Sequence, residues 1–374
     1  MKYLVLILVL LLSTTINAQL KINIGVDTTT EKSKLVINFY NKYIADFKED
    51  NEVNYADYFS TKDVENFRLP DKTAIGLIGN TTNYVLGDPY ILSLDTKSDT
   101  VKAKVMFAGT DSLENLSVYF IANYYIKIDN GDCKFLVNQN IETEKWQTKK
   151  IRNITFHYPP YHTFNIDNAR RLIDALINLE KTWELEPLKI DYYFAKTNKE
   201  IQAIKGFDFN FYMARSEYPG GLAYEQEKSI YSWGHDENYL HEFIHLYLNP
   251  VYPDSPLKEG IATFYGGSMG KSYTEHLIRL NDYIKEHPDI NIANPEEFYY
   301  LDEITNPQYA IQAFICYLVY RNKGLNGLKQ LLKIDKIDEI FRKEFLIEPQ
   351  EQNKFLREQI KKNVEKTDFS TPLR

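Results

Sequence analysis

The residues in this chain most able to do chemistry together are His241-Glu242-Phe243-Ile244-His245, two histidines four positions apart with a glutamate between them. Positions i and i+4 lie on one face of a helix, so the two imidazoles can bind a single metal ion. Glu242, next to the first histidine, can then take a proton from a water molecule near that metal. The alternative is a pair of ordinary core or surface histidines that share this spacing by chance.

A catalytic zinc ion needs a third protein ligand, because such sites use three side chains and leave one position open. Glu259 lies 14 residues after His245 and is the best candidate. Ser255 and Pro256 predict the start of a helix just before it, with Ser255 as the N-cap and Pro256 in the first turn. The short link allows this second helix to fold back onto the first.

Three other acceptors are close to the histidines in the sequence and compete for the third position. His276 is expected on a surface helix, Glu237 lies one turn before His241, and Asp254 is expected in a turn, where it would help to cap a helix. Glu259 remains the preferred ligand, since none of the three is as well placed for a first-shell bond.

The two motifs together resemble those of the gluzincin metallopeptidases, a group of peptidase MA-like proteins. His241, Glu242 and His245 match the first motif of that group, and Glu259-Gly260-Ile261-Ala262 matches the second. The resemblance covers about residues 150–335. It implies that Zn²⁺ is held by His241, His245 and Glu259, with Glu242 as the general base.

Tyr309 begins a further segment, Tyr309–Phe314, that is similar to one in many gluzincins. The resemblance implies that its hydroxyl donates a hydrogen bond to the oxyanion formed during the reaction. Gln312 stands where that group has a recurrent glycine. The alternatives are that Tyr309 is a core-facing tyrosine on an amphipathic helix, or that His235 supplies the donor. Thr263, one turn beyond Glu259, is expected to support the ligands.

The function that the resemblance implies is that of a zinc-dependent metallopeptidase, a hydrolase acting on peptides or proteins. Leu222–Trp233 is expected to form an edge strand that binds substrate in an extended conformation. The motifs do not distinguish endopeptidase from aminopeptidase activity. The alternative function is that of a binding or accessory protein that keeps the metallopeptidase fold with little or no catalysis.

The first residues of the chain indicate export. Lys2 is followed by nine apolar residues, Leu4–Leu12, and then by a polar segment ending at Ala18. This pattern is typical of a cleavable signal peptide over residues 1–18, so we expect a secreted or periplasmic protein. The apolar run is too short to span a bilayer comfortably, so stable membrane insertion is not expected; the alternative is an uncleaved membrane anchor.

Composition excludes some partners. The 374 residues carry a formal net charge of −8, which makes nucleic acid an unfavourable partner. Cys133 and Cys316 are the two cysteines, and their expected positions in different domains argue against a disulfide framework.

Periodicity predicts an α+β protein with several domains after the signal peptide. Residues 19–148 are expected to form a small domain of one helix and an antiparallel sheet, similar to nuclear-transport-factor-2-like or cystatin-like folds. This domain could bind a partner, tether substrate or act as a pro-region. Its expected elements are a helix over Glu31–Asp50, strands over Tyr84–Leu94, Val101–Ala108, Leu116–Ile128 and Cys133–Val137, and a hairpin turn at Asp129–Asp132.

Two further segments follow. Residues 149–270 are expected to form the zinc-binding subdomain with a mixed sheet, and residues 271–374 a helical C-terminal subdomain. In the first we expect strands over Ile151–Tyr158, Lys189–Ala195 and Leu222–Trp233 and helices over Asn168–Trp183 and Glu237–Leu248. In the second we expect helices over Ser272–Glu286, Pro307–Asn322, Gly324–Lys333 and Glu348–Val364.

Overall fold

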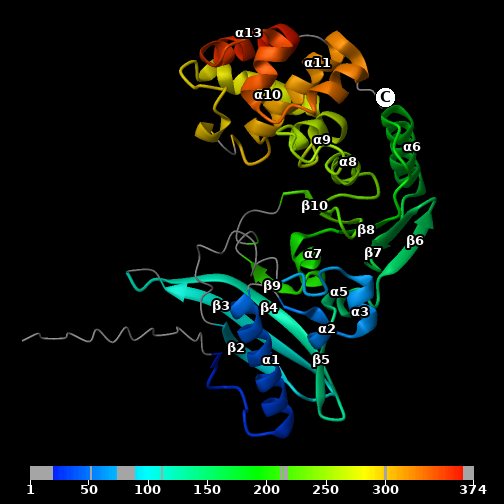
Figure 1. Ribbon diagram of the computed structural model, residues 1–374, viewed down its shortest axis with the longest axis vertical. Coiled ribbons are helices and arrows are strands. Elements are labelled where there is room, and N and C mark those ends of the chain that lie inside the picture. Colours follow the sequence, from blue (N-terminus) through cyan, green and yellow to red (C-terminus); the bar gives the residue numbers. More distant parts are fainter. Residues whose placement is uncertain are drawn as a thin grey trace, which may run out of the picture. The chain divides into compact units, whose positions relative to one another are not determined.

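The computed structural model describes residues 20–50, 53–73, 89–110, 113–210, 213, 218–298 and 301–364 (Figure 1). The expected signal peptide and residues 84–88 of the first expected strand lie outside these ranges. The chain divides into two compact units. The first comprises the described residues of Met1–Asn138 and Gly206–Phe211, and the second those of Gln139–Lys205 and Tyr212–Arg374.

The first unit is built on a six-stranded sheet in the order β1-β2-β3-β4-β5, with β9 also paired to β4. β1 runs parallel to β2, whereas the other pairs are antiparallel, so this sheet is mixed rather than purely antiparallel as expected. The strands are β1 (Lys21–Ile22), β2 (Pro89–Asp95), β3 (Thr100–Thr110), β4 (Leu116–Asp129), β5 (Asp132–Leu136) and β9 (Phe207–Asn210).

One long helix, α1 (Glu31–Asp50), packs on this sheet and has the predicted bounds. Its buried stripe includes Val36, Tyr40, Tyr43 and Phe47, whose three- and four-residue spacing places them on one helical face. The β4–β5 turn is also as predicted, since Asn130 and Gly131 both adopt positive φ. Short helices complete the unit or join it to the next: α2 (Tyr55–Tyr58), α3 (Thr61–Asn66) and α5 (Asn138–Glu142).

The second unit contains a five-stranded mixed sheet in the order β10-β11-β8-β7-β6. The three inner strands β11, β8 and β7 are parallel, and the two outer strands are antiparallel to their neighbours. β10 is therefore an edge strand. The strands are β6 (Gln147–Ile151), β7 (Ile154–Tyr158), β8 (Ile190–Ala195), β10 (Gly220–Tyr224) and β11 (Ser229–Trp233).

Two predictions of a single strand are wrong in detail, because each segment contains residues of two strands. The strand expected over Ile151–Tyr158 is the end of β6 and all of β7, joined by a turn in which Arg152 has a φ of 54°. The strand expected over Leu222–Trp233 is the hairpin β10–β11, in which Lys228 has a φ of 51°. Each turn uses a left-handed residue that is neither glycine nor asparagine, so the usual turn signature is missing.

The helix α6 (Ile166–Trp183) covers one face of the second sheet. Asn165 caps it by accepting hydrogen bonds from the backbone of Asp167 and Asn168. Its Leu172, Leu176 and Leu179 are buried in the same core as Tyr192 and Phe194 of β8. The predicted helix over Asn168–Trp183 is confirmed with one further half-turn at its start. A helix that was not predicted, α7 (Asn198–Ile204), contacts β8 and β11.

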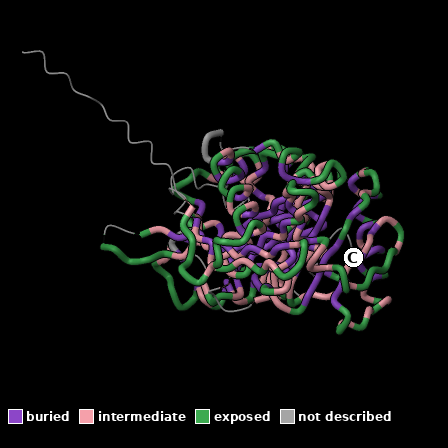
Figure 2. Tube along the Cα trace, turned by 90° about the horizontal axis from the view of Figure 1, so that it is seen from below, coloured by how far each residue is buried: buried purple, intermediate pink, exposed green. Residues whose placement is uncertain are grey.

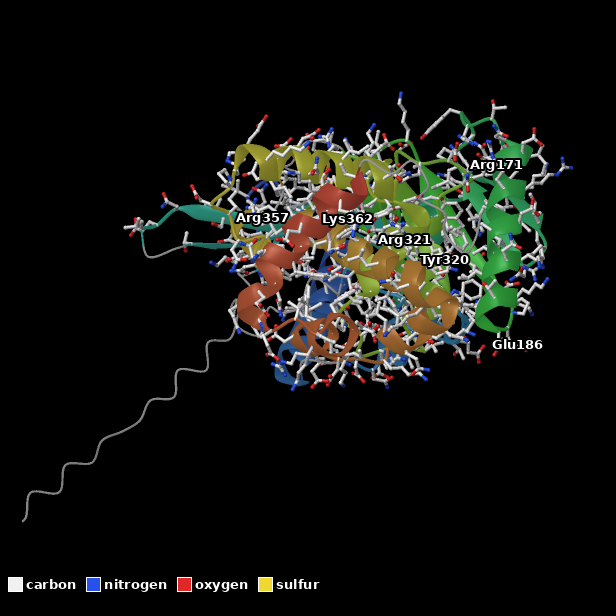
Figure 3. The ribbon with its side chains drawn as sticks, turned by 90° about the horizontal axis from the view of Figure 1, so that it is seen from above. Arg171, Glu186, Tyr320, Arg321, Arg357 and Lys362 are labelled. Carbon is white, nitrogen blue, oxygen red and sulfur yellow. The ribbon has the colours of Figure 1, made fainter. Side chains whose placement is uncertain are left out.

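The remaining helices are coloured from yellow-green to red in Figure 1, where α10, α11 and α13 are drawn above α9 (Lys258–Gly266). They include α10 (Tyr273–Glu286) and α13 (Gln352–Val364), which lie in contact, and Arg357 of α13 donates a hydrogen bond to the carbonyl of Ile284 (Figure 3). α11 is interrupted at Gly324, which leaves the helical conformation with a φ of 64°, so its two parts correspond to the two helices predicted on either side of Lys323. The bounds are α8 (Leu240–Leu248), α9 (Lys258–Gly266), η3 (Pro295–Phe298), α11 (Pro307–Leu331), α12 (Ile337–Ile340), η4 (Phe341–Phe345) and η5 (Pro349–Glu351).

The fold class is α+β, as predicted, with two mixed sheets. One large apolar core joins α6, α8, α9, α10, α11 and α13 to the second sheet, and the buried positions are purple in Figure 2. Burial of this apolar surface is the main stabilising term for the helices that carry the candidate site. In the described part of the chain, no helix is both long enough and apolar enough to span a bilayer.

Candidate metal centre

Both histidines lie on α8, a short helix that is buried along nearly its whole length. Every residue from His241 to Leu248 is buried. The helix begins at Leu240, later than expected, because Tyr239 has a non-helical conformation with a φ of −119° and a ψ of 88°. It ends at Leu248, and Pro250 follows its C-cap. Burial in a packed core restricts the rotation of both imidazole rings.

The third residue, Glu259, lies in the first turn of α9, which folds back against α8. Gly266, at the other end of α9, permits this approach, since a Cβ there would lie 2.5 Å from the backbone nitrogen of His241. Ser255 was predicted as the N-cap, but the N-cap is Leu257. The hydroxyl of Ser255 instead accepts a hydrogen bond from the backbone of Leu257 at 3.3 Å.

The three candidate ligand atoms are spaced as the corners of a zinc tetrahedron would be. The Nε2 atoms of His241 and His245 are 3.2 Å apart, and Oε2 of Glu259 lies 3.3 Å and 3.5 Å from them. Ligands about 2.0–2.1 Å from a tetrahedral metal are about 3.3–3.4 Å from one another. No other group of three or more such ligands within the described ranges meets the same geometric condition.

The hydrogen bonds of the rings turn both Nε2 atoms toward this centre. Nδ1 of His241 lies 2.6 Å from the carbonyl oxygen of Gly267, so Nδ1 carries the proton and Nε2 is free to bind a metal. Nδ1 of His245 lies 3.4 Å from Oδ1 of Asn249. The amide of Asn249 donates to Glu225 at 2.8 Å, which directs Oδ1 toward the ring.

In the absence of a metal, the charges of His245 and Glu259 stabilise each other. Burial lowers the pKa of His245, but the hydrogen bond and charge of Glu259 outweigh burial and raise this pKa to about 9. Burial raises the pKa of Glu259, but its interactions with His241 and His245 outweigh burial and hold this pKa far below its usual value. A divalent cation would take the place of the proton that His245 carries at neutral pH.

Glu242 lies in the first turn of α8 and is buried against the edge strand β10 (Figure 1). A Cβ at Gly221 of β10 would lie 2.6 Å from Cγ and 2.8 Å from Oε1 of Glu242, so only glycine leaves room for this carboxylate. Oε1 also lies 3.3 Å from the hydroxyl of Tyr239, which donates a hydrogen bond to it.

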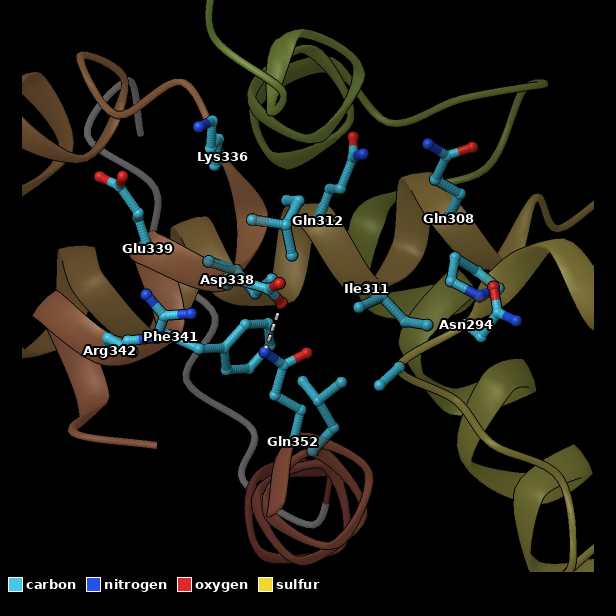
Figure 4. A pocket seen from close by; sticks show the side chains of 15 residues that line it. Asn294, Gln308, Ile311, Gln312, Lys336, Asp338, Glu339, Phe341, Arg342 and Gln352 are labelled. Atoms are coloured by element: carbon cyan, nitrogen blue, oxygen red, sulfur yellow. Dashed lines mark hydrogen bonds between the residues drawn. The ribbon is translucent and has the colours of Figure 1, made fainter. Parts of the chain in front are cut away.

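Tyr309 is half-buried in the first turn of α11, and Asn306 caps that turn by accepting a hydrogen bond from the backbone of Tyr309. One turn later, Gln312 packs on α9, because a Cβ at Gly260 would lie 2.5 Å from Cβ of Gln312. α11, which carries Tyr309, therefore contacts α9, which carries Glu259. A cavity of about 630 Å³ lies beside this part of α11, and Gln312 and Gln308 are among its lining residues (Figure 4). The role of Tyr309 as a hydrogen-bond donor stays a prediction.

Two of the three residues that compete with Glu259 as the third ligand have other partners. His276 is buried rather than on the surface, and its nitrogens lie 3.0 Å from the hydroxyl of Thr305 and 2.9 Å from the carbonyl of Ser268. Glu237 is buried and accepts hydrogen bonds from His162 and the backbone of Asn165. Asp254 is exposed. None of the three belongs to the ligand group.

The other two residues that we singled out are the half-buried His235 and the fully buried Thr263, and both are uncharged at neutral pH. His235 stacks on Tyr239 with ring centroids 3.6 Å apart, and burial, together with the nearby His241, lowers its pKa to about 4. Thr263 is fully buried, and its hydroxyl has no hydrogen-bond partner among the described residues.

Comparisons with family models, with curated proteins and with solved structures find no match for this chain. The likeness to gluzincins therefore rests on the residues of the two motifs and stays a prediction.

The sequence did not reveal the groups that orient these side chains. They are the carbonyl of Gly267, the side chains of Asn249 and Glu225, and the Gly221 and Tyr239 pair beside Glu242. Asn249 had a readable signal, because it lies four residues after His245 on the same helix. Gly266-Gly267, at the end of α9, was a second signal for a close backbone approach.

Proposed function

We propose that this chain is an exported zinc-dependent peptidase, with Glu242 as its general base. We infer that the second unit is a metallopeptidase domain of the gluzincin kind and that the first unit is a separate accessory domain. The observation that carries the proposal is the convergence of two imidazole nitrogens and one carboxylate oxygen, 3.2–3.5 Å apart, on one centre.

The donor set supports zinc over the other common metals. Two nitrogens and one carboxylate oxygen suit Zn²⁺, whereas Ca²⁺ and Mg²⁺ prefer sites made of oxygen alone. The donated hydrogen bond from Nδ1 of His241 also fixes the tautomer that a metal requires. When bound, zinc would lower the pKa of water and polarise the carbonyl of the substrate.

The side chains of the chain supply the rest of the reaction. Glu242 takes a proton from water at its carboxylate and passes it to the leaving amine. Tyr309 donates a hydrogen bond to the oxyanion, a contribution of about 2–4 kcal/mol if it acts as such donors usually do.

The substrate that this arrangement favours is an extended peptide. β10 is an edge strand of its sheet, and Gly221 in this strand lies against Glu242. A peptide that pairs with β10 would gain main-chain hydrogen bonds beside the general base.

Metal analysis and peptide digestion test the proposal. The wild-type protein is expected to bind one zinc ion per chain and to cleave members of a peptide library. Glu242→Gln is expected to keep its zinc and to lose cleavage by at least a hundredfold, because it removes the general base. Glu186→Gln is the matched control, since Glu186 is exposed just beyond the end of α6 (Figure 3).

Two outcomes would contradict the peptidase. A protein that binds zinc and cleaves no peptide would be the accessory protein that is the alternative to an enzyme. A protein that binds no zinc would contradict both the peptidase and the zinc-binding accessory protein.

A further inference from the structure

Tyr239 makes a contact with Glu242 that neither motif requires. It precedes α8 and is buried, with 6% of its surface exposed. Its hydroxyl lies 3.3 Å from Oε1 of Glu242. In the described part of the chain, Oε2 of the same carboxylate accepts no hydrogen bond, so the two oxygens of Glu242 are in different environments.

The ring of Tyr239 is held on three sides. His235 stacks on one face at 3.6 Å with an interplanar angle of 8°, and the ring of His241 lies nearly parallel to it at 6.0 Å. On its edge, a Cβ at Gly221 would lie 2.6 Å from Cε1. Contacts on three sides leave the hydroxyl little freedom to move away from Glu242.

We propose that Tyr239 is a positioning residue that fixes the carboxylate of Glu242 in the orientation needed for proton transfer. This inference rests on the proposed function of Glu242. The hydrogen bond from Tyr239 occupies Oε1 and leaves Oε2 to receive the proton. A free glutamate side chain populates many rotamers, and one donor on one oxygen removes most of that freedom before substrate binds.

The helix that follows Tyr239 offers a matched control. The hydroxyl of Tyr247, which lies on α8 itself, donates to a carboxylate oxygen of Glu180 at 2.6 Å and accepts a hydrogen bond from the backbone of Leu188 at 3.2 Å, and Tyr247 is buried like Tyr239. Tyr239→Phe and Tyr247→Phe therefore each remove one buried hydroxyl and one hydrogen bond to a glutamate. Only the first change affects the glutamate of the candidate site.

Kinetics on the zinc-loaded protein form the first test. Tyr239→Phe is expected to lower kcat about tenfold with KM and the zinc dissociation constant unchanged, since one hydrogen bond to a charged group is lost. Tyr247→Phe is expected to keep the kcat of the wild type. An unchanged kcat in Tyr239→Phe, or an equal fall in both variants, overturns the proposal.

A second readout does not depend on activity. Carbon-13 NMR of the glutamate side-chain carboxyls, without metal, identifies the Glu242 signal by its loss in Glu242→Gln. Tyr239→Phe is expected to shift that signal and Tyr247→Phe to shift only the Glu180 signal. If wild type cleaves nothing but the Glu242 signal shifts, the proposed function is wrong and the contact stands. If the signal does not shift, the positioning role is wrong.

A further variant covers the case in which Tyr239→Phe does not fold. His235→Leu removes the ring stacked on Tyr239 and keeps the hydroxyl. It is expected to lower kcat about threefold, as the loss of one aromatic contact would. A kcat equal to that of wild type would overturn the proposal here too.

Discussion

At the scale of single residues, His245 links the charge of the centre to pH. Its pKa of about 9 follows from burial, which lowers it, and from the hydrogen bond and charge of Glu259, which together raise it further. The folded-state pKa lies above the ordinary value of 6.5. The pair with Glu259 therefore stabilises the metal-free protein fully below about pH 6.5, and this contribution is lost as the pH rises through about 9.

Zinc binding is expected to release a proton from His245, because only the neutral ring binds a metal. Between pH 7 and 8.5 the zinc affinity should rise about tenfold per pH unit, since these values lie below the pKa of about 9. Isothermal titration calorimetry in buffers with different ionisation enthalpies measures the protons released. Binding with no proton release at pH 7 would contradict the charge state given to His245.

Gly221→Ala is expected to impair catalysis more than folding. The new Cβ would lie 2.6 Å from Cγ of Glu242 and must displace that side chain or β10, at a cost of about 1–3 kcal/mol. Peptidase assays and urea unfolding measure the two effects. Gly25→Ala is the control, since a Cβ there meets nothing within 4 Å. Full activity in Gly221→Ala would show that Glu242 need not lie against β10.

At the scale of elements, the sequence predicted what is local and missed what depends on distant partners. α8 and α9 were predicted because their ligand spacing and apolar positions follow the helical period. The hairpins at Arg152 and Lys228 were missed, because these residues carry no turn signature. The bond from His241 to the carbonyl of Gly267 was missed, because every residue has a carbonyl and composition does not mark the one that is used.

Asn249, the C-cap of α8, is expected to affect metal affinity without contacting the metal. Asn249→Ala removes the partner of Nδ1 of His245 and should weaken zinc binding about tenfold, as the loss of such supporting hydrogen bonds does. Competition with a chromophoric chelator measures the dissociation constant. Asn178→Ala, an exposed change on α6, is the control and should leave that constant as it is in the wild type.

At the scale of the whole molecule, zinc should stabilise the folded chain, because the unfolded chain does not hold the three ligands together. At a free zinc concentration 100 times the dissociation constant, the gain is about 2.7 kcal/mol. Calorimetric melting with and without a chelator measures it. His245→Ala should melt at the same temperature in both conditions, and a zinc-dependent shift in that variant would place the ion elsewhere.

The path of the chain constrains the order in which its parts are completed during synthesis. β9 (Phe207–Asn210) pairs with Phe120–Ala122 of β4, although the intervening residues 139–205 belong to the other unit. A ribosome that has released the first 138 residues has therefore not yet supplied one strand of that sheet. In a fragment that ends at residue 138, the backbone groups of β4 that pair with β9 have no partner strand. Such a fragment is expected to aggregate by pairing of these exposed strand edges.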